Sequence, residues 1–205
     1  CSLGDALNLF VPLRKNALRV NKKVQTNVIL SQEQQKAYEF LNSHDKALLF
    51  GDTGSGKTEV YIRLIEECIN SGKSAIFLMP EIGLTPQTKK RLKDAFGDTV
   101  AIWHSKVTKK KKEEILKALS KGKISLIAGT RSALFLPVSN LGLIVVDEEH
   151  DDSYKSSQRP RYNARDLALL FAKRKNAKVV LGSATPSLTS YKNLLKYRLK
   201  GTYFS

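Results

Sequence analysis

Short apolar runs recur along the chain from about residue 46 onward. They occupy residues 46–50, 75–79, 99–103, 124–128, 142–146 and 178–182. Continuous apolar runs of this length, bounded by polar or turn-forming residues, are typical of strands that are buried on both faces. The pattern therefore predicts a sheet whose core strands lie at these six places.

Helical patterns separate most of these runs, because apolar residues recur there at i, i+3 or i+4 spacing. The residues at this spacing are Val60, Tyr61, Leu64, Ile65 and Cys68, then Ile115, Leu116 and Leu119, and then Leu167, Leu170 and Phe171. Strands that alternate with helices are joined by right-handed crossovers and form parallel sheets. We therefore predict an α/β fold with a mainly parallel central sheet and helices on both faces.

The residues before position 46 do not show this alternation of strand and helix patterns. Residues 31–42 predict one helix, because Ser31 and Gln34 have the spacing of a capping box. Residues 1–30 are mixed, with five basic residues against Asp5, and we interpret them as the remnant of a preceding domain plus a linker. The chain begins with Cys1 and has no signal-peptide pattern, so we expect it to be a piece of a longer protein.

Composition narrows the class of protein. The 205 residues are 41% hydrophobic and 26% charged, which is ordinary for a globular domain and excludes a wholly disordered, collagen-like or coiled-coil chain. No apolar run approaches about 18 residues, so we expect neither a membrane span nor a membrane partner. Two cysteines provide neither a disulfide framework nor a zinc site, which favours a reducing, cytoplasmic compartment or indifference to redox state.

The balance of charge is strongly basic. The 35 Lys and Arg residues exceed the 19 Asp and Glu residues, which gives a net charge of +16. Such a surplus favours a polyanionic partner, although a lysine-rich organism would produce the same surplus. Eight lysines lie in residues 106–123, against Glu113 and Glu114. We interpret this run first as the solvated face of a helix.

The first apolar run leads directly into a phosphate-binding pattern, G-x-x-x-x-G-K-T, set between a strand and a helix. The residues of the pattern are Gly51, Asp52, Thr53, Gly54, Ser55, Gly56, Lys57 and Thr58. Glycines allow consecutive N–H groups to point at a phosphate, and the following helix adds its positive N-terminal end. We predict that Lys57 reaches the β- and γ-phosphates of ATP and that the Thr58 hydroxyl binds Mg²⁺.

A phosphate loop also needs a carboxylate at the end of a second strand to hold the metal. Residues 143–146 are apolar and are followed at once by Asp147 and Glu148. We predict that Asp147 positions Mg²⁺ and that Glu148 orients or deprotonates the attacking water. Together with Lys57, these two carboxylates are the expected catalytic residues.

Longer strings of residues carry a family resemblance. Residues 147–150, Asp-Glu-Glu-His, resemble motif II of superfamily 2 helicases, and residues 182–186, Gly-Ser-Ala-Thr-Pro, resemble motif III. The strings at 80–87, 129–135, 147–151 and 161–166 narrow the resemblance to the PriA-type replication-restart helicases, over about residues 30–195. This implies a RecA-like P-loop domain at residues 31–205, the first motor lobe of a 3′→5′ DNA helicase. Residues 1–30 are then the remnant of an N-terminal DNA-binding domain plus a linker.

The resemblance also implies partners and further parts. PriA-type proteins act at stalled or recombined forks and reload the replicative helicase. Forked and single-stranded DNA, single-strand-binding protein and primosome components are thus the implied partners. Zinc is expected in the full-length protein but not in this chain, and the second motor lobe with its arginine finger is absent. We therefore expect the lobe alone to have little or no ATPase activity.

Several positions gain a role through the resemblance. In motifs II and III, residues that couple the nucleotide to DNA are implied at His150, Ser183, Ala184 and Thr185. Loops that follow strands are expected to contact the DNA backbone, through Glu81, Thr85 and Gln87 and through Thr130, Arg131 and Ser132. A turn bounded by prolines is the alternative for the first loop, and a structural ion pair of Arg131 is the alternative for the second. Gln34 has two open interpretations, as a reader of adenine or as the capping partner of Ser31.

Residues 150–166 are expected to form one long functional connection. It holds aromatic and cationic residues, which suit a single strand because bases stack on rings and phosphates pair with cations. The residues assigned to DNA are Tyr154, Lys155, Arg161 and Tyr162. In PriA-type helicases this segment is the aromatic-rich loop that couples DNA binding to hydrolysis, and we expect it to become ordered on DNA. The alternative is a passive, solvated surface loop.

Three other functions are compatible with parts of the sequence. The chain could be another superfamily 2 DNA translocase, RecG-like or restriction-type, but the strings at 80–87 and 129–135 argue against this. It could be a DNA-binding module with a relic P-loop, but Lys57, Thr58, Asp147 and Glu148 are all intact. A nucleotide kinase is a third possibility, although no lid pattern is evident.

Overall fold

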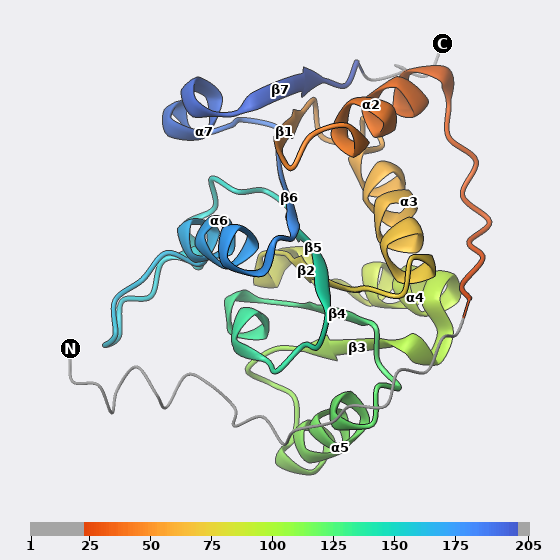
Figure 1. Cartoon of the computed structure of the whole chain (residues 1–205). Coiled ribbons are helices and arrows are strands. Elements are labelled where there is room, and N and C mark those ends of the chain that lie inside the picture. The colour runs from red at the N-terminus through yellow and green to blue at the C-terminus, as the bar shows by residue number, and fades with distance from the viewer. Residues whose placement is uncertain (1–22, 201–205) are drawn as a thin grey trace.

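The structure, a computed structural model, describes residues 23–200 (Figure 1). Most of the segment interpreted as a domain remnant, and the last five residues, lie outside this range. None of the helices within 23–200 combines the length and apolar character needed to span a bilayer.

A seven-stranded sheet forms the centre, with the strand order β3-β4-β2-β5-β6-β1-β7. Every pairing in it is parallel. The strands are β1 (Lys46–Phe50), β2 (Ser74–Leu78), β3 (Val100–Trp103), β4 (Leu126–Gly129), β5 (Leu141–Val146), β6 (Lys178–Ser183) and β7 (Leu195–Arg198). The apolar runs correspond to β1 through β6, so the predicted parallel α/β sheet is confirmed.

The edge strand β7 was not predicted. It pairs in parallel with β1, and its sequence Leu-Lys-Tyr-Arg contains no apolar run. Its first residue, Leu195, is 58% exposed. A short strand at the edge of a sheet has little buried surface, and its backbone pairing leaves no hydrophobic signature.

Helices cover both faces of the sheet (Figure 1). One apolar core lies under α2 (Gln32–Asn42), α3 (Lys57–Asn70) and α4 (Pro86–Phe96). A second core, on the opposite face, lies under α5 (Lys109–Ser120) and α6 (Ala164–Lys175). The remaining elements are the short helix α7 (Leu188–Asn193) and the 3₁₀ turns η1 (Glu81–Gly83), η2 (Gly97–Thr99), η3 (Arg131–Phe135) and η4 (Asp152–Tyr154).

The buried face of α6 differs from the face that the sequence predicted. Ala164, Ala168 and Ala172 are fully buried, whereas Leu170 is 42% exposed. Alanines let the helix approach the sheet closely, so the small residues form the contact face. The larger Leu167 and Phe171 pack only partly against the core.

The chain before α2 already packs on the lobe. The backbone N–H of Val24 donates to Asn70 Oδ1 at 2.8 Å, and Thr26 Oγ1 donates to Glu66 at 2.8 Å. Both partners lie on α3. Part of the segment interpreted as a linker therefore lies along the motor lobe from residue 24 onward.

The parallel arrangement of the strands determines where functional residues can lie close together. In a parallel sheet, all strands end at the same edge, and the loops that follow them meet there. The loops after β1, β2, β4, β5 and β6 carry most of the residues predicted to act on nucleotide or DNA.

Candidate nucleotide site and DNA-facing loops

The phosphate loop connects β1 to α3, as predicted. Gly54 and Gly56 have φ angles of 83° and 87°, a left-handed backbone that glycine adopts readily. Gly56 is the N-cap of α3, and Lys57 is its first residue. The loop therefore meets the N-terminal end of a 14-residue helix, where unpaired N–H groups and the helix dipole favour an anion.

Gln34 contacts this loop from α2. Its Nε2 donates to the Gly56 carbonyl at 3.3 Å, while its Oε1 accepts the Ser31 N–H at 2.8 Å. A Cβ at position 56 would collide with the Gln34 amide. The capping interpretation is thus confirmed, and the same side chain also lies against the phosphate loop. Its adenine-reading role stays a prediction.

Lys57 is buried at the centre of the loop, with 7% of its surface exposed. Its Nζ donates to the carbonyls of Gly51 at 2.8 Å and Asp52 at 3.2 Å, and lies 3.9 Å from Glu148 Oε1. A buried ammonium group is costly unless it is paired, so these acceptors hold it in place. A phosphate would offer the same group a charge-assisted acceptor.

Asp147 lies directly after β5, and its N–H donates to the Leu78 carbonyl at 2.9 Å. The Tyr61 hydroxyl, from α3, donates to Asp147 Oδ1 at 3.3 Å. Burial raises the pKa of Asp147 to about 6, the Glu148 charge adds to this rise, and Lys57 opposes it. A divalent cation beside the carboxylate would favour its charged form.

The tyrosine contact depends on the absence of a side chain in β6. A Cβ at Gly182 would collide with the Tyr61 hydroxyl. Sequence reasoning placed Tyr61 only in the apolar core. Its i+4 position after Lys57 brings its hydroxyl to the carboxylate of Asp147, but the spacing alone carries no signal for that.

Glu148 has the uncommon left-handed conformation for a residue other than glycine, with φ of 46°. Its Oε2 accepts the Ala184 N–H at 3.2 Å, and its Oε1 faces Lys57. The carboxylate thus lies between the phosphate loop and the segment after β6. This is a position from which it could hold a water near a phosphate.

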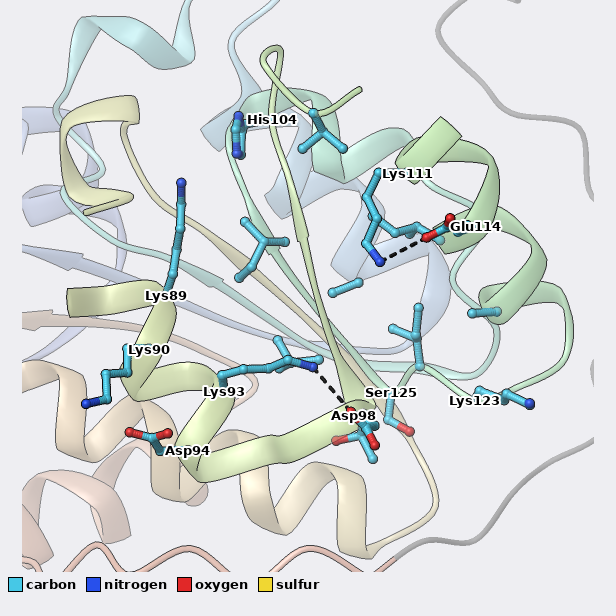
Figure 2. Close-up of a pocket in the computed structure, with 18 residues that line it drawn as sticks. Lys89, Lys90, Lys93, Asp94, Asp98, His104, Lys111, Glu114, Lys123 and Ser125 are labelled. Carbon is cyan, nitrogen blue, oxygen red and sulfur yellow. Dashed lines mark hydrogen bonds and ion pairs between the residues drawn. The ribbon is translucent and has the colours of Figure 1, made fainter. Parts of the chain in front are cut away.

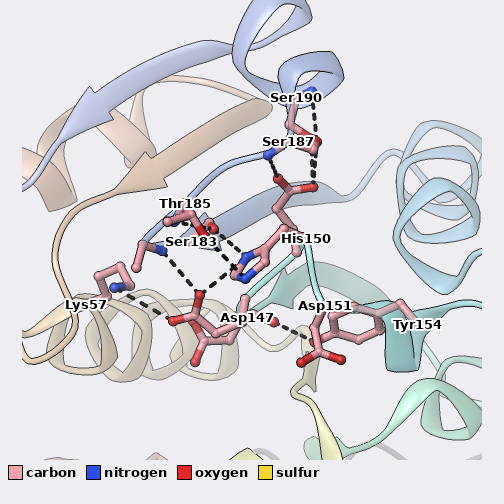
Figure 3. Close-up of polar contacts among 12 residues, drawn as sticks. Lys57, Asp147, His150, Asp151, Tyr154, Ser183, Thr185, Ser187 and Ser190 are labelled. Atoms are coloured by element: carbon pink, nitrogen blue, oxygen red, sulfur yellow. Dashed lines mark hydrogen bonds and ion pairs between the residues drawn. The ribbon is translucent and has the colours of Figure 1, made fainter.

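His150 joins the ends of two strands, as Figure 3 shows. Its Nδ1 lies 2.7 Å from Ser183 Oγ and 3.6 Å from Glu148 Oε2, and its Nε2 lies 3.3 Å from Thr185 Oγ1. The structure therefore brings the four predicted coupling residues into one network with Glu148. Whether the network transmits a signal stays a prediction.

Glu149 was missed by sequence reasoning. It is 1% exposed and accepts from the N–H of Ser187 at 2.7 Å, Ser190 Oγ at 2.8 Å and Arg165 at 3.1 Å. Burial acts to raise its pKa, but the hydrogen bonds from Ser187, Ser190 and Arg165 outweigh burial, so the pKa lies below the ordinary value. Glu149 thus joins the end of β5 to the starts of α6 and α7.

The loop and the carboxylate fit a nucleotide with Mg²⁺. Ser55 Oγ is buried and has no hydrogen-bond partner within residues 23–200. Thr58 and Asp147 line one cavity of about 180 Å³, and hydroxyl and carboxylate oxygens are suitable Mg²⁺ ligands. No group of three His, Cys, Asp or Glu in this part of the chain could hold a metal alone. The phosphates and water would complete the coordination.

The segment after β2 lies beside this site. Glu81 is exposed and accepts from Ser105 Oγ at 3.1 Å. Thr85 is the N-cap of α4, because its hydroxyl accepts the Thr88 N–H at 3.1 Å. Gln87 is exposed and lines the same cavity as Thr58 and Asp147. Contact of this segment with DNA stays a prediction.

The segment after β4 differs from expectation in two of its three residues. Thr130 is only 8% exposed, so its side chain is not free for a DNA contact. The Arg131 guanidinium donates to the carbonyls of Ser153 at 2.9 Å and Lys155 at 2.7 Å. Arg131 therefore holds the loop of residues 150–166 through carbonyl groups, where the alternative had expected an ion pair. Ser132 is partly exposed.

Tyr154 corrects the interpretation of the aromatic-rich loop. Its ring is 1% exposed, and its hydroxyl donates to the Asp147 carbonyl at 2.6 Å (Figure 3). The prediction that this ring stacks on bases is wrong for this structure, because the ring is enclosed in the core. Tyr154 instead fixes the start of the loop to the residue expected to hold Mg²⁺.

The rest of the loop folds back on itself. Lys155 pairs with Asn163 in an antiparallel bridge, and the Ser156 N–H donates to the Tyr162 carbonyl at 2.8 Å. Lys155 and Arg161 are exposed, whereas Tyr162 is half-buried. The Tyr162 and Phe135 rings meet edge to face at 5.1 Å. The exposed groups of the hairpin are therefore mainly cationic.

The sequence pattern of the DEAD/DEAH box helicases matches residues 31–194. The chain belongs to this family. Among solved structures, RecG bound to a three-way DNA junction resembles it with a TM-score of 0.62 and 25% identity, over 84% of this chain and 24% of RecG. The Pyrococcus furiosus Hef helicase domain has a TM-score of 0.57 and 18% identity, over 80% of this chain and 38% of that one. The RecA-like helicase fold is thereby confirmed.

Relatives at higher identity are named Replication restart protein PriA. The Helicobacter pylori protein (strain 26695) is 50% identical over 98% of this chain, and the Bacillus subtilis protein is 45% identical over 79%. The chain spans only 33% and 21% of these two relatives. The predicted resemblance to PriA-type helicases is confirmed, and the chain carries a helicase motor domain of a family that uses ATP and Mg²⁺.

Proposed function

We propose that this chain is the ATP-binding first motor lobe of a 3′→5′ DNA helicase that acts at stalled or recombined replication forks, restarts replication and reloads the replicative helicase. The observation that carries the proposal is the 50% identity, over 98% of the chain, to a protein named for replication restart. An intact phosphate loop and carboxylate pair support a hydrolysing lobe.

The nucleotide site would work through its own side chains. The phosphate loop from Gly51 to Thr58 would bind the phosphates, with Lys57 on the β- and γ-phosphates. Thr58 and Asp147 would hold Mg²⁺, which neutralises charge that develops on the phosphates. Glu148, 3.9 Å from Lys57, would orient the attacking water and receive its proton. Gln34 lies next to the loop and would contact the adenine.

The division of the chain forms part of the proposal. Residues 31–205 would be the motor lobe, and residues 1–30 the end of an N-terminal DNA-binding domain and a linker. A longer cytoplasmic protein would add a second motor lobe and a zinc-binding insertion. Its proposed partners are forked and single-stranded DNA, single-strand-binding protein and primosome components.

The lobe alone should hydrolyse ATP very slowly. An arginine from a facing lobe typically contributes about 10³–10⁵ in rate to phosphoryl transfer. The two internal candidates are engaged elsewhere, since Arg131 donates to loop carbonyls and Arg165 pairs with the buried Glu149. Robust DNA-stimulated hydrolysis by the 205-residue chain would contradict the proposed need for a second lobe.

Unwinding assays on the intact protein test the proposal. Forks with a single-stranded 3′ arm should be unwound with ATP and Mg²⁺, and forks with only a 5′ arm should not. ATPase activity should rise with forked DNA. Unwinding that requires the 5′ arm would refute the stated polarity, and the absence of any DNA-stimulated ATPase would refute the motor.

A RecG-like translocase is the second candidate, because RecG bound to a three-way junction is structurally similar to this chain. Such a motor would move duplex junctions without requiring a single-stranded 3′ arm. Processing of fully double-stranded junctions in the same assay would favour this candidate. The identity of 25% to RecG, against 50% to the restart protein, supports the first proposal more strongly.

A further inference from the structure

Half of the positive surplus is concentrated in one stretch of the chain. Residues 86–125 contain twelve Lys and Arg residues against four Asp and Glu residues, a surplus of eight, while the whole chain has +16. This stretch comprises α4, β3 and α5. Like charges this close repel one another, so the surface favours binding of a polyanion.

The two helices lie on either side of the sheet edge formed by β3. Leu92 of α4 belongs to one apolar core and Ile115 of α5 to the other, and β3 is the last strand of the sheet on this side. A groove of about 1240 Å³ lies between the helices, as Figure 2 shows. The lysines that line it are Lys89, Lys90, Lys93, Lys111 and Lys123. We define the α4–α5 basic surface as the lysines of residues 89–123.

Most cations of this surface form no ion pair within the part of the chain that the structure describes. Within the described residues, Lys93 pairs with Asp98 at 3.4 Å and Lys111 with Glu114 at 3.0 Å. The lysines that form no ion pair in this part of the chain are Lys89, Lys90, Lys106, Lys109, Lys110, Lys112, Lys117, Lys121 and Lys123. The solvated-helix interpretation explains their exposure but not their concentration on and directly beside two helices that face one groove.

The surface adjoins the segment expected to contact DNA. The helix α4 begins at Pro86, directly after Thr85. The loop after β3 contacts the same segment, because Ser105 Oγ donates to Glu81 at 3.1 Å. The N-terminal ends of α4 and α5 therefore continue the edge of the sheet where the proposed single-strand path lies.

The chemistry of the surface suits a phosphate backbone and not stacked bases. The two large aromatic residues of this stretch, Phe96 and Trp103, are 2% and 9% exposed. A surface that binds single strands presents rings to the bases, whereas lysines alone recognise phosphates. Double-stranded DNA keeps its bases stacked inside and presents only its phosphate backbones and grooves.

We propose that the α4–α5 basic surface binds the backbone of a double-stranded arm of the forked substrate. This inference rests on the proposed helicase function. The apolar floor of the groove, with Val100, Ile102 and Ile115, would also suit an acidic peptide. DNA is favoured because Lys109, Lys110, Lys117 and Lys121 extend the charge beyond the residues that line the groove.

The test uses the intact protein and the triple variant Lys90→Gln/Lys109→Gln/Lys110→Gln, whose three side chains are exposed. The matched control is Lys173→Gln/Arg174→Gln/Lys175→Gln, three exposed cations at the end of α6. Affinities for a fork with a duplex arm and for single-stranded DNA are measured without ATP across a range of salt concentrations. Thermal melts check folding.

The triple variant should bind the fork more weakly and single-stranded DNA normally. The slope of log affinity against log salt should fall by about 0.9 for each lost phosphate contact, so by up to about 3. Unchanged fork affinity, equal loss on single-stranded DNA, or equal loss in the control would each overturn the proposal. An alternating Asp-Val octapeptide is the probe for a protein partner. If the wild-type protein binds this peptide, the triple variant does not bind it, and fork affinity is unchanged, the groove is assigned to a protein partner.

The two proposals fail in different ways. If the wild-type protein shows no DNA-stimulated ATPase or unwinding, the helicase function fails. If the wild-type protein unwinds forks while the triple variant binds duplex arms normally, only the inference about the basic surface fails.

Discussion

The Nδ1 atom of His150 lies 2.7 Å from the hydroxyl oxygen of Ser183, so the segment after β5 is joined directly to the end of β6. Glu148 extends this contact in both directions, because it accepts the Ala184 N–H at 3.2 Å and lies 3.9 Å from Lys57. A continuous set of polar contacts thus leads from the phosphate loop to residues 183–185. Such a network can carry coupling if it has two arrangements.

We expect His150→Ala and Ser183→Ala to reduce stimulation of the ATPase by DNA while basal activity changes less than about threefold. Both substitutions remove the hydrogen bond between His150 and Ser183, and each also removes one contact to Thr185. Because the His150–Ser183 bond is shared, the double variant should show a non-additive energy of about 1 kcal/mol. ATPase rates against single-strand concentration provide the measurement. Additive effects would indicate that the two residues act independently, and His44→Ala, outside this network, is the control.

Lys57→Ala should abolish hydrolysis by the intact enzyme, with a loss of at least about 10²–10³ in kcat, because the ammonium group expected on the phosphates is removed. The fold should persist, since alanine is a favourable residue at the first position of α3. Steady-state ATPase rates and a thermal melt check both parts. Near-normal turnover would refute the phosphate assignment.

Glu148→Gln should leave ATP and Mg²⁺ binding nearly unchanged and slow turnover strongly. The amide oxygen can still accept from Ala184, but an amide cannot receive a proton from water. Binding of a fluorescent nucleotide, measured beside kcat, separates the two effects. If nucleotide affinity collapses instead, Glu148 is a metal ligand and the roles of the carboxylate pair must be exchanged.

Glu149→Gln should lower the free energy of unfolding by about 3 kcal/mol, because a buried carboxylate that pairs with Arg165 is lost. Urea unfolding of the chain measures this, and the exposed Glu114→Gln should cost less than about 1 kcal/mol. The folded pKa of Glu149 lies below its ordinary 4.5, so its contribution is present above pH 4.5 and is lost as pH falls through the folded pKa. The difference between wild type and Glu149→Gln should therefore shrink in acid, and a constant difference would contradict this.

Tyr154→Phe should cost about 1 kcal/mol of stability and leave DNA affinity unchanged, because it removes only the hydrogen bond to the Asp147 carbonyl. Arg161→Gln, on the exposed part of the hairpin, should instead weaken single-strand binding and leave stability unchanged. Urea unfolding and DNA titration are measured for both variants. A loss of DNA affinity in Tyr154→Phe, which keeps the ring, would contradict this and show that the hydrogen bond to Asp147 positions the loop for DNA.

Much of the fold and of the nucleotide site is local in the sequence and was therefore predictable. Six core strands show as apolar runs, because strands buried on both faces cannot tolerate polar residues. The phosphate loop is eight consecutive residues between one strand and one helix, and Asp147 and Glu148 directly follow another strand. Short-range patterns of this kind are visible without knowledge of the tertiary structure.

The tertiary structure decided which side chains face which. Tyr154 and Arg131 are of residue types that commonly contact DNA. In the structure, however, the Tyr154 ring is enclosed in the core and the Arg131 guanidinium donates to loop carbonyls. Glu149 reads as one more acid in an acidic turn, but the parallel order of β5 beside β6 places it against Ser187, 38 residues away in sequence. Burial and hydrogen-bond partners depend on residues that are distant in the chain, and no local pattern encodes that distance.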